Sequence, residues 1–81
     1  MKSIKEIVAE WKVEIGIKPF QETVVIHKDD DRLFIITQRP GRFIGRQGCF
    51  VNKYIEIMRK NGHEINHINF VDSFVGNVRE F

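Results

Sequence analysis

The chain has 81 residues, of which 42% are hydrophobic and 30% charged, and its formal net charge is +2. This length allows one small domain, and the composition is typical of a folded globular protein. We expect neither a secretory signal nor a membrane partner, because no apolar run approaches the ~18 residues of a membrane span. The single Cys49 cannot form an internal disulfide, so the cytoplasm is the expected compartment.

The charge is unevenly distributed along the sequence. Residues 39–60 hold six basic residues and one acidic residue, whereas the remainder holds seven basic and ten acidic residues. The middle segment therefore carries +5 and the rest of the chain −3. Such a concentration of positive charge predicts an anionic partner at one face.

The first half of the sequence predicts a helix followed by a β-hairpin. The capping box Ser3–Glu6 begins a helical repeat of apolar residues, which Gly16 ends, with Pro19 beyond it. Apolar runs at 23–27 and 33–37 predict two strands, joined by the polar turn 28–31. The second run has apolar residues on both faces, so its outer face is expected to be covered by the C-terminal tail, a second copy or a protein partner.

The second half predicts two helices, a loop and a strand. Pro40 begins a short helix over 41–44, a tight loop occupies 45–48, and a longer helix over 49–60 ends at Asn61-Gly62. Residues 65–71 predict a third strand, parallel to the strand before the loop. The tail 74–81 is ambiguous, because its apolar spacing allows a short helix that Gly76 disfavours. The expected fold is thus α+β, in the order α-β-β-α-α-β, with a three-stranded mixed sheet and helices packed on one face.

The loop Ile44-Gly45-Arg46-Gln47-Gly48 is the candidate binding site in this sequence. It is not a Walker loop, because it lacks the lysine and the hydroxyl residue. Glycine permits a close backbone approach, and the amides that open the following helix favour an anion. The alternative is a plain corner between helices, in which glycine serves only geometry. The basic segment and the neighbouring apolar residues favour a nucleic acid.

The I-G-x-x-G pattern between two helices, in this order of elements, resembles the K-homology (KH) domain of the prokaryotic type, type II. The stretches TQRPGRFIGRQG at 37–48 and INFVD at 68–72 are similar to the ribosomal members of that family, found at the mRNA entry of the small subunit. The resemblance covers residues 1–73, which leaves 74–81 as a tail. Gln47 departs from a family position that is commonly basic, and the ribosomal members carry a second domain and a basic arm that this chain lacks.

The resemblance implies a module that binds single-stranded RNA, with single-stranded DNA as an open possibility. Phosphates would lie on the loop and bases in an apolar groove between the helices and the last strand. The implied binding residues are Arg39, Arg42, Ile44, Gly45, Arg46, Gln47, Gly48, Val51, Asn52, Lys53 and Ile68. Neither a cofactor nor an enzymatic activity is expected. The alternative is a protein-interaction domain that kept the fold and lost RNA binding.

Three other signals are set aside. The sequence HEINH at 63–67 matches a zinc-protease motif, but that motif needs a helix, and here it follows the helix stop and enters a strand-like stretch. Cys49 is interpreted as a packing residue, and the three aspartates at 29–31 as a solvated turn. We therefore expect no catalytic residue and no metal ligand.

Overall fold

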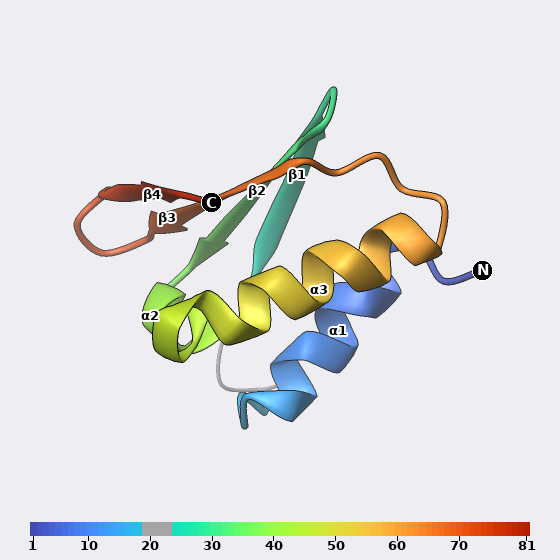
Figure 1. Cartoon of the computed structure of the whole chain (residues 1–81). Coiled ribbons are helices and arrows are strands. Elements are labelled where there is room, and N and C mark those ends of the chain that lie inside the picture. The colour runs from blue at the N-terminus through green and yellow to red at the C-terminus, as the bar shows by residue number, and fades with distance from the viewer. Residues whose placement is uncertain (19–23) are drawn as a thin grey trace.

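The helices lie against one face of a four-stranded mixed sheet (Figure 1). The structure is a computed structural model, and it describes residues 1–18 and 24–81. The α+β class is confirmed, and the expected order of elements holds over residues 4–72. The expectation of three strands is wrong, because a fourth strand follows. Thr23, where the first strand was predicted to begin, and Pro19 both lie outside the described residues.

Helix α1 spans Ile4–Glu14 and begins at the predicted capping box. The Ser3 hydroxyl accepts a hydrogen bond from the Glu6 amide at 3.2 Å, and the Glu6 carboxylate accepts one from the Ser3 amide at 3.4 Å. Ile7, Val8 and Trp11 are buried on one side of the helix. None of the helices in the described ranges has the length and apolar character that crossing a bilayer requires.

Strands β1 (Val25–Asp29) and β2 (Arg32–Thr37) form an antiparallel hairpin. Asp29 pairs with Arg32, so only Asp30 and Asp31 remain in the turn, which is tighter than predicted. Asp30 has φ +56°, the left-handed conformation that such short turns require and that aspartate tolerates.

Strand β3 (His67–Asp72) runs parallel to β2, as predicted. The crossover between them contains α2 (Pro40–Ile44), the 3₁₀ turn η1 (Arg46–Gly48) and α3 (Cys49–Lys60). Leu33 pairs with Ile68 and Ile35 pairs with Phe70, and these residues are buried under the helices.

The tail forms strand β4 (Val78–Glu80), antiparallel to β3, so the suggestion of a short helix there is wrong. The Asp72 carboxylate accepts hydrogen bonds from the amides of Phe74 and Val75, at 2.8 and 3.3 Å. Gly76 has φ +75°, which turns the chain back toward β3. Asx hydrogen bonding and a left-handed glycine together specify a turn, which a helix could not accommodate.

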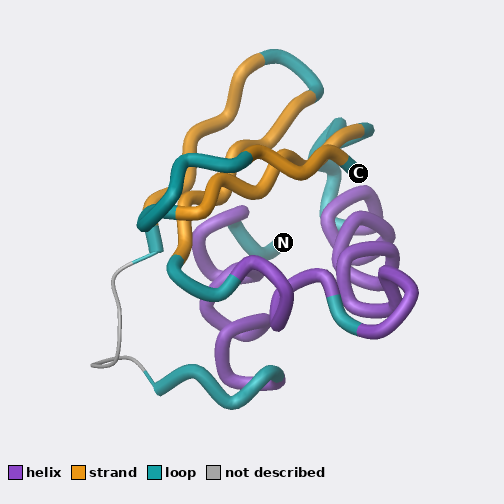
Figure 2. The backbone as a smooth tube through the Cα atoms, turned by 90° about the vertical axis from the view of Figure 1, so that its left-hand side faces the viewer, coloured by secondary structure: helices purple, strands orange, loops and turns teal. Residues whose placement is uncertain are grey.

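An aromatic cluster around Trp11 joins the helices to the sheet. The Trp11 ring is stacked on Tyr54 of α3, with 4.7 Å between centroids and 7° between planes. It meets Phe43 of α2 at 5.2 Å and Phe70 of β3 at 5.9 Å, both edge to face. Figure 2 shows the helices on one side of the strands, where this cluster lies. A single α1 side chain thus contacts three other elements.

The other face of the sheet carries an apolar row. Val25, Ile36, Val71 and Val78 lie opposite one another on the four successive strands. Val25 is 50% exposed and Val78 is 57% exposed. The tail therefore extends the sheet at its edge and does not cover this face, which corrects the expectation that the tail might fold across it.

Replacing Trp11 by alanine should lower the free energy of unfolding by ~3–5 kcal/mol, because a fully buried ring is lost and a cavity remains. Urea denaturation followed by far-ultraviolet circular dichroism measures this. The control is Val13→Ala, at a 70% exposed position of the same helix, where a change within about 0.5 kcal/mol is expected. Equal losses in the two variants would contradict the central role of the cluster.

Candidate nucleic-acid interface

The backbone conformation of the loop between α2 and α3 favours glycine at two positions. Gly45 has φ +77° and ψ 172°, and Gly48 has φ +75° and ψ 19°. A Cβ atom on Gly45 would lie 2.5 Å from Cδ2 of Phe50 and 2.9 Å from Sγ of Cys49. Conformation and space therefore both require glycine at position 45, whereas position 48 requires it for conformation.

Backbone hydrogen bonds hold the loop tip in place. The Gly45 amide donates to the Gly41 carbonyl at 3.0 Å, and the Gly48 amide donates to the Gly45 carbonyl at 3.2 Å. Gln47 is left-handed, with φ +56°, although it is not a glycine. Arg46 and Gln47 are exposed at the tip. The two side chains are thus presented to solvent by a defined backbone.

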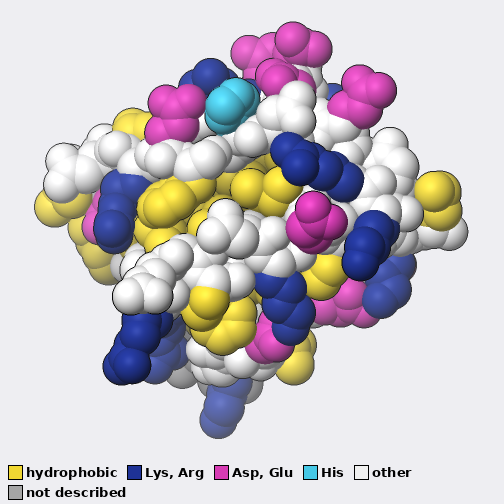
Figure 3. Space-filling view, in the orientation of Figure 1, with side chains coloured by type: hydrophobic (Ala, Val, Ile, Leu, Met, Phe, Trp, Pro, Cys, Tyr) yellow, Lys and Arg dark blue, Asp and Glu magenta, His cyan; other side chains and the backbone are white. Residues whose placement is uncertain are grey.

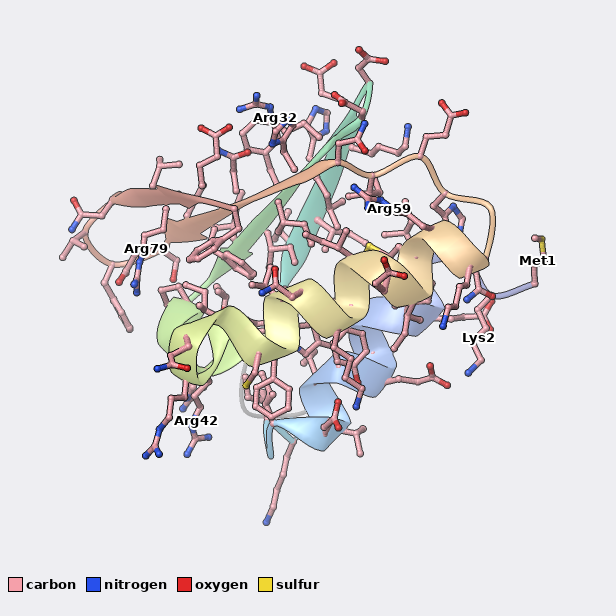
Figure 4. All side chains as sticks on the ribbon, in the orientation of Figure 1. Met1, Lys2, Arg32, Arg42, Arg59 and Arg79 are labelled. Carbon is pink, nitrogen blue, oxygen red and sulfur yellow. The ribbon has the colours of Figure 1, made fainter. Side chains whose placement is uncertain are left out.

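The surroundings of the loop are basic. Arg42 and Arg46 are exposed and Arg39 is half-buried. Basic side chains gather at the α2 end of the molecule in Figure 3, and Figure 4 shows Arg42 extending from α2 into solvent. Within the described residues, the first turn of α3 has no acidic residue and no side-chain cap. The positive end of the α3 dipole and the nearby guanidinium groups create a region that favours an anion.

The three apolar residues expected in the groove belong to the core. Ile44 is 5% exposed, and Val51 and Ile68 are completely buried. Asn52, one turn into α3, is exposed and lies beside Gly48, where a Cβ atom would be 3.4 Å from its side-chain nitrogen. The structure therefore brings the polar and glycine positions together on the surface, while the apolar positions support the loop from below.

Lys53, expected at the rim of the groove, points toward α1. Its ammonium group lies 2.6 Å from the Glu14 carboxylate, to which the Tyr54 hydroxyl also donates a hydrogen bond. The hydrogen bond from Lys53 and the one from Tyr54 lower the pKa of Glu14. Burial raises the pKa of Tyr54, and the same hydrogen bond adds to that effect. Lys53 thus ties α3 to α1, and its charge is offset.

Two of the cavities lined by described residues lie away from the loop. One, of about 190 Å³, separates α1 from β1 and is lined by Lys5, Val8, Ala9, Lys12, Val24 and Ile26. The other, of about 400 Å³, lies beyond the end of α3 and is lined by Arg59, Gly62, His63, Glu64 and Asn66. Arg59 donates to the Ile65 carbonyl and to the Asn66 side chain there, so its role is to hold the loop that follows α3.

As predicted, the HEINH stretch at 63–67 does not form a helix. His63 lies in the loop after α3, with its Nε2 atom 2.8 Å from the Lys2 carbonyl oxygen, and His67 begins β3. In residues 1–18 and 24–81, no three histidine, cysteine or acidic side chains are grouped so that they could hold a metal ion. Cys49 is exposed at the start of α3.

Arg79 and Phe81 were not among the predicted binding residues, although Arg79 lies at the same end of the molecule as Arg42 (Figure 4). They belong to the β4 segment, which was not predicted as a strand. The sequence Val78-Arg79-Glu80-Phe81 does not alternate between apolar and polar residues, so periodicity does not predict a strand there.

Comparisons with protein-family models, with curated proteins and with solved structures found no match to this chain.

Replacing Gly45 by alanine should reduce the free energy of unfolding by about 2–4 kcal/mol, since the new methyl group meets Phe50 in a backbone conformation that alanine avoids. Gly41→Ala is the matched control in the preceding helix, where a Cβ atom meets nothing within 4 Å. It should be neutral or stabilising by up to about 1 kcal/mol. Thermal and urea unfolding compare the two. Similar stabilities would contradict the close contact.

Replacing Glu14 by glutamine tests the contact between α3 and α1. Because the folded-state pKa of Glu14 is lowered, the carboxylate stabilises the fold above its unfolded pKa, and this contribution is lost as pH falls through the folded pKa. The wild type should therefore be more stable than Glu14→Gln at neutral pH, and the difference should shrink below about pH 4. Chemical denaturation across this range measures it. Glu56→Gln, on the exposed side of α3, is the control, and a difference for Glu14→Gln that is independent of pH would contradict the assignment.

Proposed function

We propose that this protein binds single-stranded RNA through the loop Gly45–Gly48, as a type II K-homology domain. The observation that carries the proposal is the loop itself. Its two glycines have positive φ, and the exposed Arg46 and Gln47 stand between two helices in a basic region. The parallel pairing of β2 with β3, and the likeness of residues 37–48 to the family motif, support the same assignment.

The loop is suited to a phosphodiester backbone. Gly45 and Gly48 hold the tip in a conformation that presents Arg46 and Gln47 to solvent, and the exposed Arg42 and Arg46 supply positive charge there. A K-homology loop clamps about four backbone nucleotides, so the contacts involve few phosphates and binding is salt-sensitive. Recognition of a backbone does not require the 2′-hydroxyl, so single-stranded DNA is a competitor to include. The proposal assigns binding without a chemical reaction and without a cofactor.

The second candidate function is protein interaction through the open sheet face. The observation that favours it is the apolar row Val25, Ile36, Val71 and Val78, whose outer members are half exposed. A second copy of the chain or another protein would bury this row. The two candidates use opposite faces of the molecule, so variants of the loop distinguish them.

Replacing Arg46 and Gln47 together by aspartate should weaken binding to a short single-stranded RNA at least tenfold. One attractive charge is lost and two repulsive charges then face the phosphates. Aspartate tolerates the left-handed backbone at position 47, so the melting temperature should change little. Fluorescence anisotropy with a labelled RNA of random sequence, at low and moderate salt, measures the affinity and its salt dependence.

The control is Lys5→Asp combined with Ala9→Asp, which removes the same formal charge from α1. Both positions are exposed and line the cavity beside β1, and Figure 1 places the start of α1 at the opposite end of the molecule from α2. This variant should lose far less affinity, because charges beyond a Debye length are screened. Unchanged binding in the loop variant would contradict the clamp and favour the sheet face as the functional surface.

A further inference from the structure

Strand β4 has a helix side and an open side, because its residues alternate across the sheet. Arg79 pairs with Phe70, and Phe81 exchanges two backbone hydrogen bonds with Ile68, at 2.9 and 2.8 Å. Directly opposed residues of antiparallel strands share a face. Phe70 and Ile68 are buried under the helices, so Arg79 and Phe81 lie on the helix side of the sheet, at its edge.

Phe81 is a partly open aromatic ring on a fixed backbone. Its ring lies 5.9 Å from that of Phe70, edge to face at 73°, and the residue remains 36% exposed. One part of the ring is thus packed against the core and another part is accessible. Nucleic-acid bases stack on aromatic side chains held in this way, and such stacking tolerates any base.

Arg79 lies at the end of the sheet nearest to the glycine loop. The ring centroid of its partner Phe70 lies 6.0 Å from that of Phe43 in α2, and α2 leads directly into the loop. Figure 4 shows Arg79 and Arg42 on opposite sides of α2, at the same end of the molecule. In the same orientation, Figure 3 shows apolar side chains exposed between α3 and the strands β3 and β4.

The acidic residues of this segment point elsewhere. Glu80 lies on the open side, where its carboxylate is 3.1 Å from Arg32. The Asp72 carboxylate accepts the amide hydrogen bonds of the β3–β4 turn. The helix side of β4 therefore combines a cation and an aromatic ring without an acidic side chain from its own strand.

We propose that the helix side of β4 is the second wall of the RNA-binding surface, with Phe81 stacking on a base and Arg79 contacting a phosphate. This inference rests on the proposed function and extends it to residues outside the loop. Because β4 pairs with the edge of β3, the backbone groups along that edge are already bonded. Bases would therefore be held by side chains of β4 and not by the β3 backbone, which predicts weak preference among bases.

The test uses the full chain and a short fluorescein-labelled single-stranded RNA of random sequence. Phe81→Leu should weaken binding about tenfold through lost stacking. Phe81→Trp keeps an aromatic ring at this position and should restore the affinity to that of the wild type. Phe74→Leu is the matched control, at a position 74% exposed in the β3–β4 turn, and should bind as the wild type does. Arg79→Gln is at an exposed position and leaves the fold intact. It should flatten the log–log salt slope by about 0.7, the contribution of one phosphate on a single strand, whereas Lys60→Gln should not.

The outcomes separate this inference from the function on which it rests. If Phe81→Leu and Arg79→Gln bind like their controls while the aspartate variant of the loop does not bind, the second wall is overturned and the clamp stands. If the wild-type chain fails to bind, or the loop variant binds unchanged, both are overturned. Loss of affinity in Phe81→Leu that Phe81→Trp does not restore, with melting temperatures unchanged, would overturn the stacking role.

Discussion

The parallel pairing of β2 with β3 is the constraint on which the rest of the structure depends. After β2 the chain must return to the other end of the sheet before β3 can begin, which requires a crossover. The twelve residues of α3 provide it, since they span about 18 Å and the six residues of β2 span about 20 Å. The reversal that precedes α3 must then lie beyond the end of β2. The glycine loop is that reversal, so its place at one end of the molecule follows from the direction of a strand.

A crossover helix alone would not hold the loop at a fixed height above the sheet. The rings of Trp11, Phe43 and Phe70 do so, because they join α1, α2 and β3 in mutual contact. Phe43 lies two residues before Gly45, and Phe50, which closes the space beside Gly45, lies two residues after Gly48. The exposed loop tip is therefore flanked on both sides by residues packed into or against the core. Such support gives a surface loop a defined conformation before any ligand arrives, which lowers the entropy lost on binding.

The sequence predicted the elements whose signals are local. Ser3 with Glu6, Pro40 and the glycines at 45 and 48 each mark a boundary by their own hydrogen bonding or backbone geometry, and the structure has α1, α2 and the loop at those places. Contacts between distant residues were not predictable in this way. Lys53 pairs with Glu14, 39 positions away, and no local pattern distinguishes that lysine from one at the rim of a groove. Periodicity placed Val51 on the apolar face of a helix and Ile68 in a strand, but only the packing shows that both side chains are fully buried.

Strand β4 was not predicted from the sequence, and its presence changes both an edge of the sheet and the charge of one face. Three residues are too few for periodicity, and the strand is defined by its partner, since its hydrogen bonds are made to β3. Its presence covers one edge of the sheet, which would otherwise offer unpaired backbone groups to other chains. Because successive side chains of β4 lie on opposite faces of the sheet, Glu80 lies beside Arg32 on the open side and Arg79 lies on the helix side. A one-residue shift in the pairing of β4 would exchange these faces and place the carboxylate toward the glycine loop. The electrostatic character of that side of the molecule thus depends on the register of one short strand, which the two hydrogen bonds between Phe81 and Ile68 help to hold.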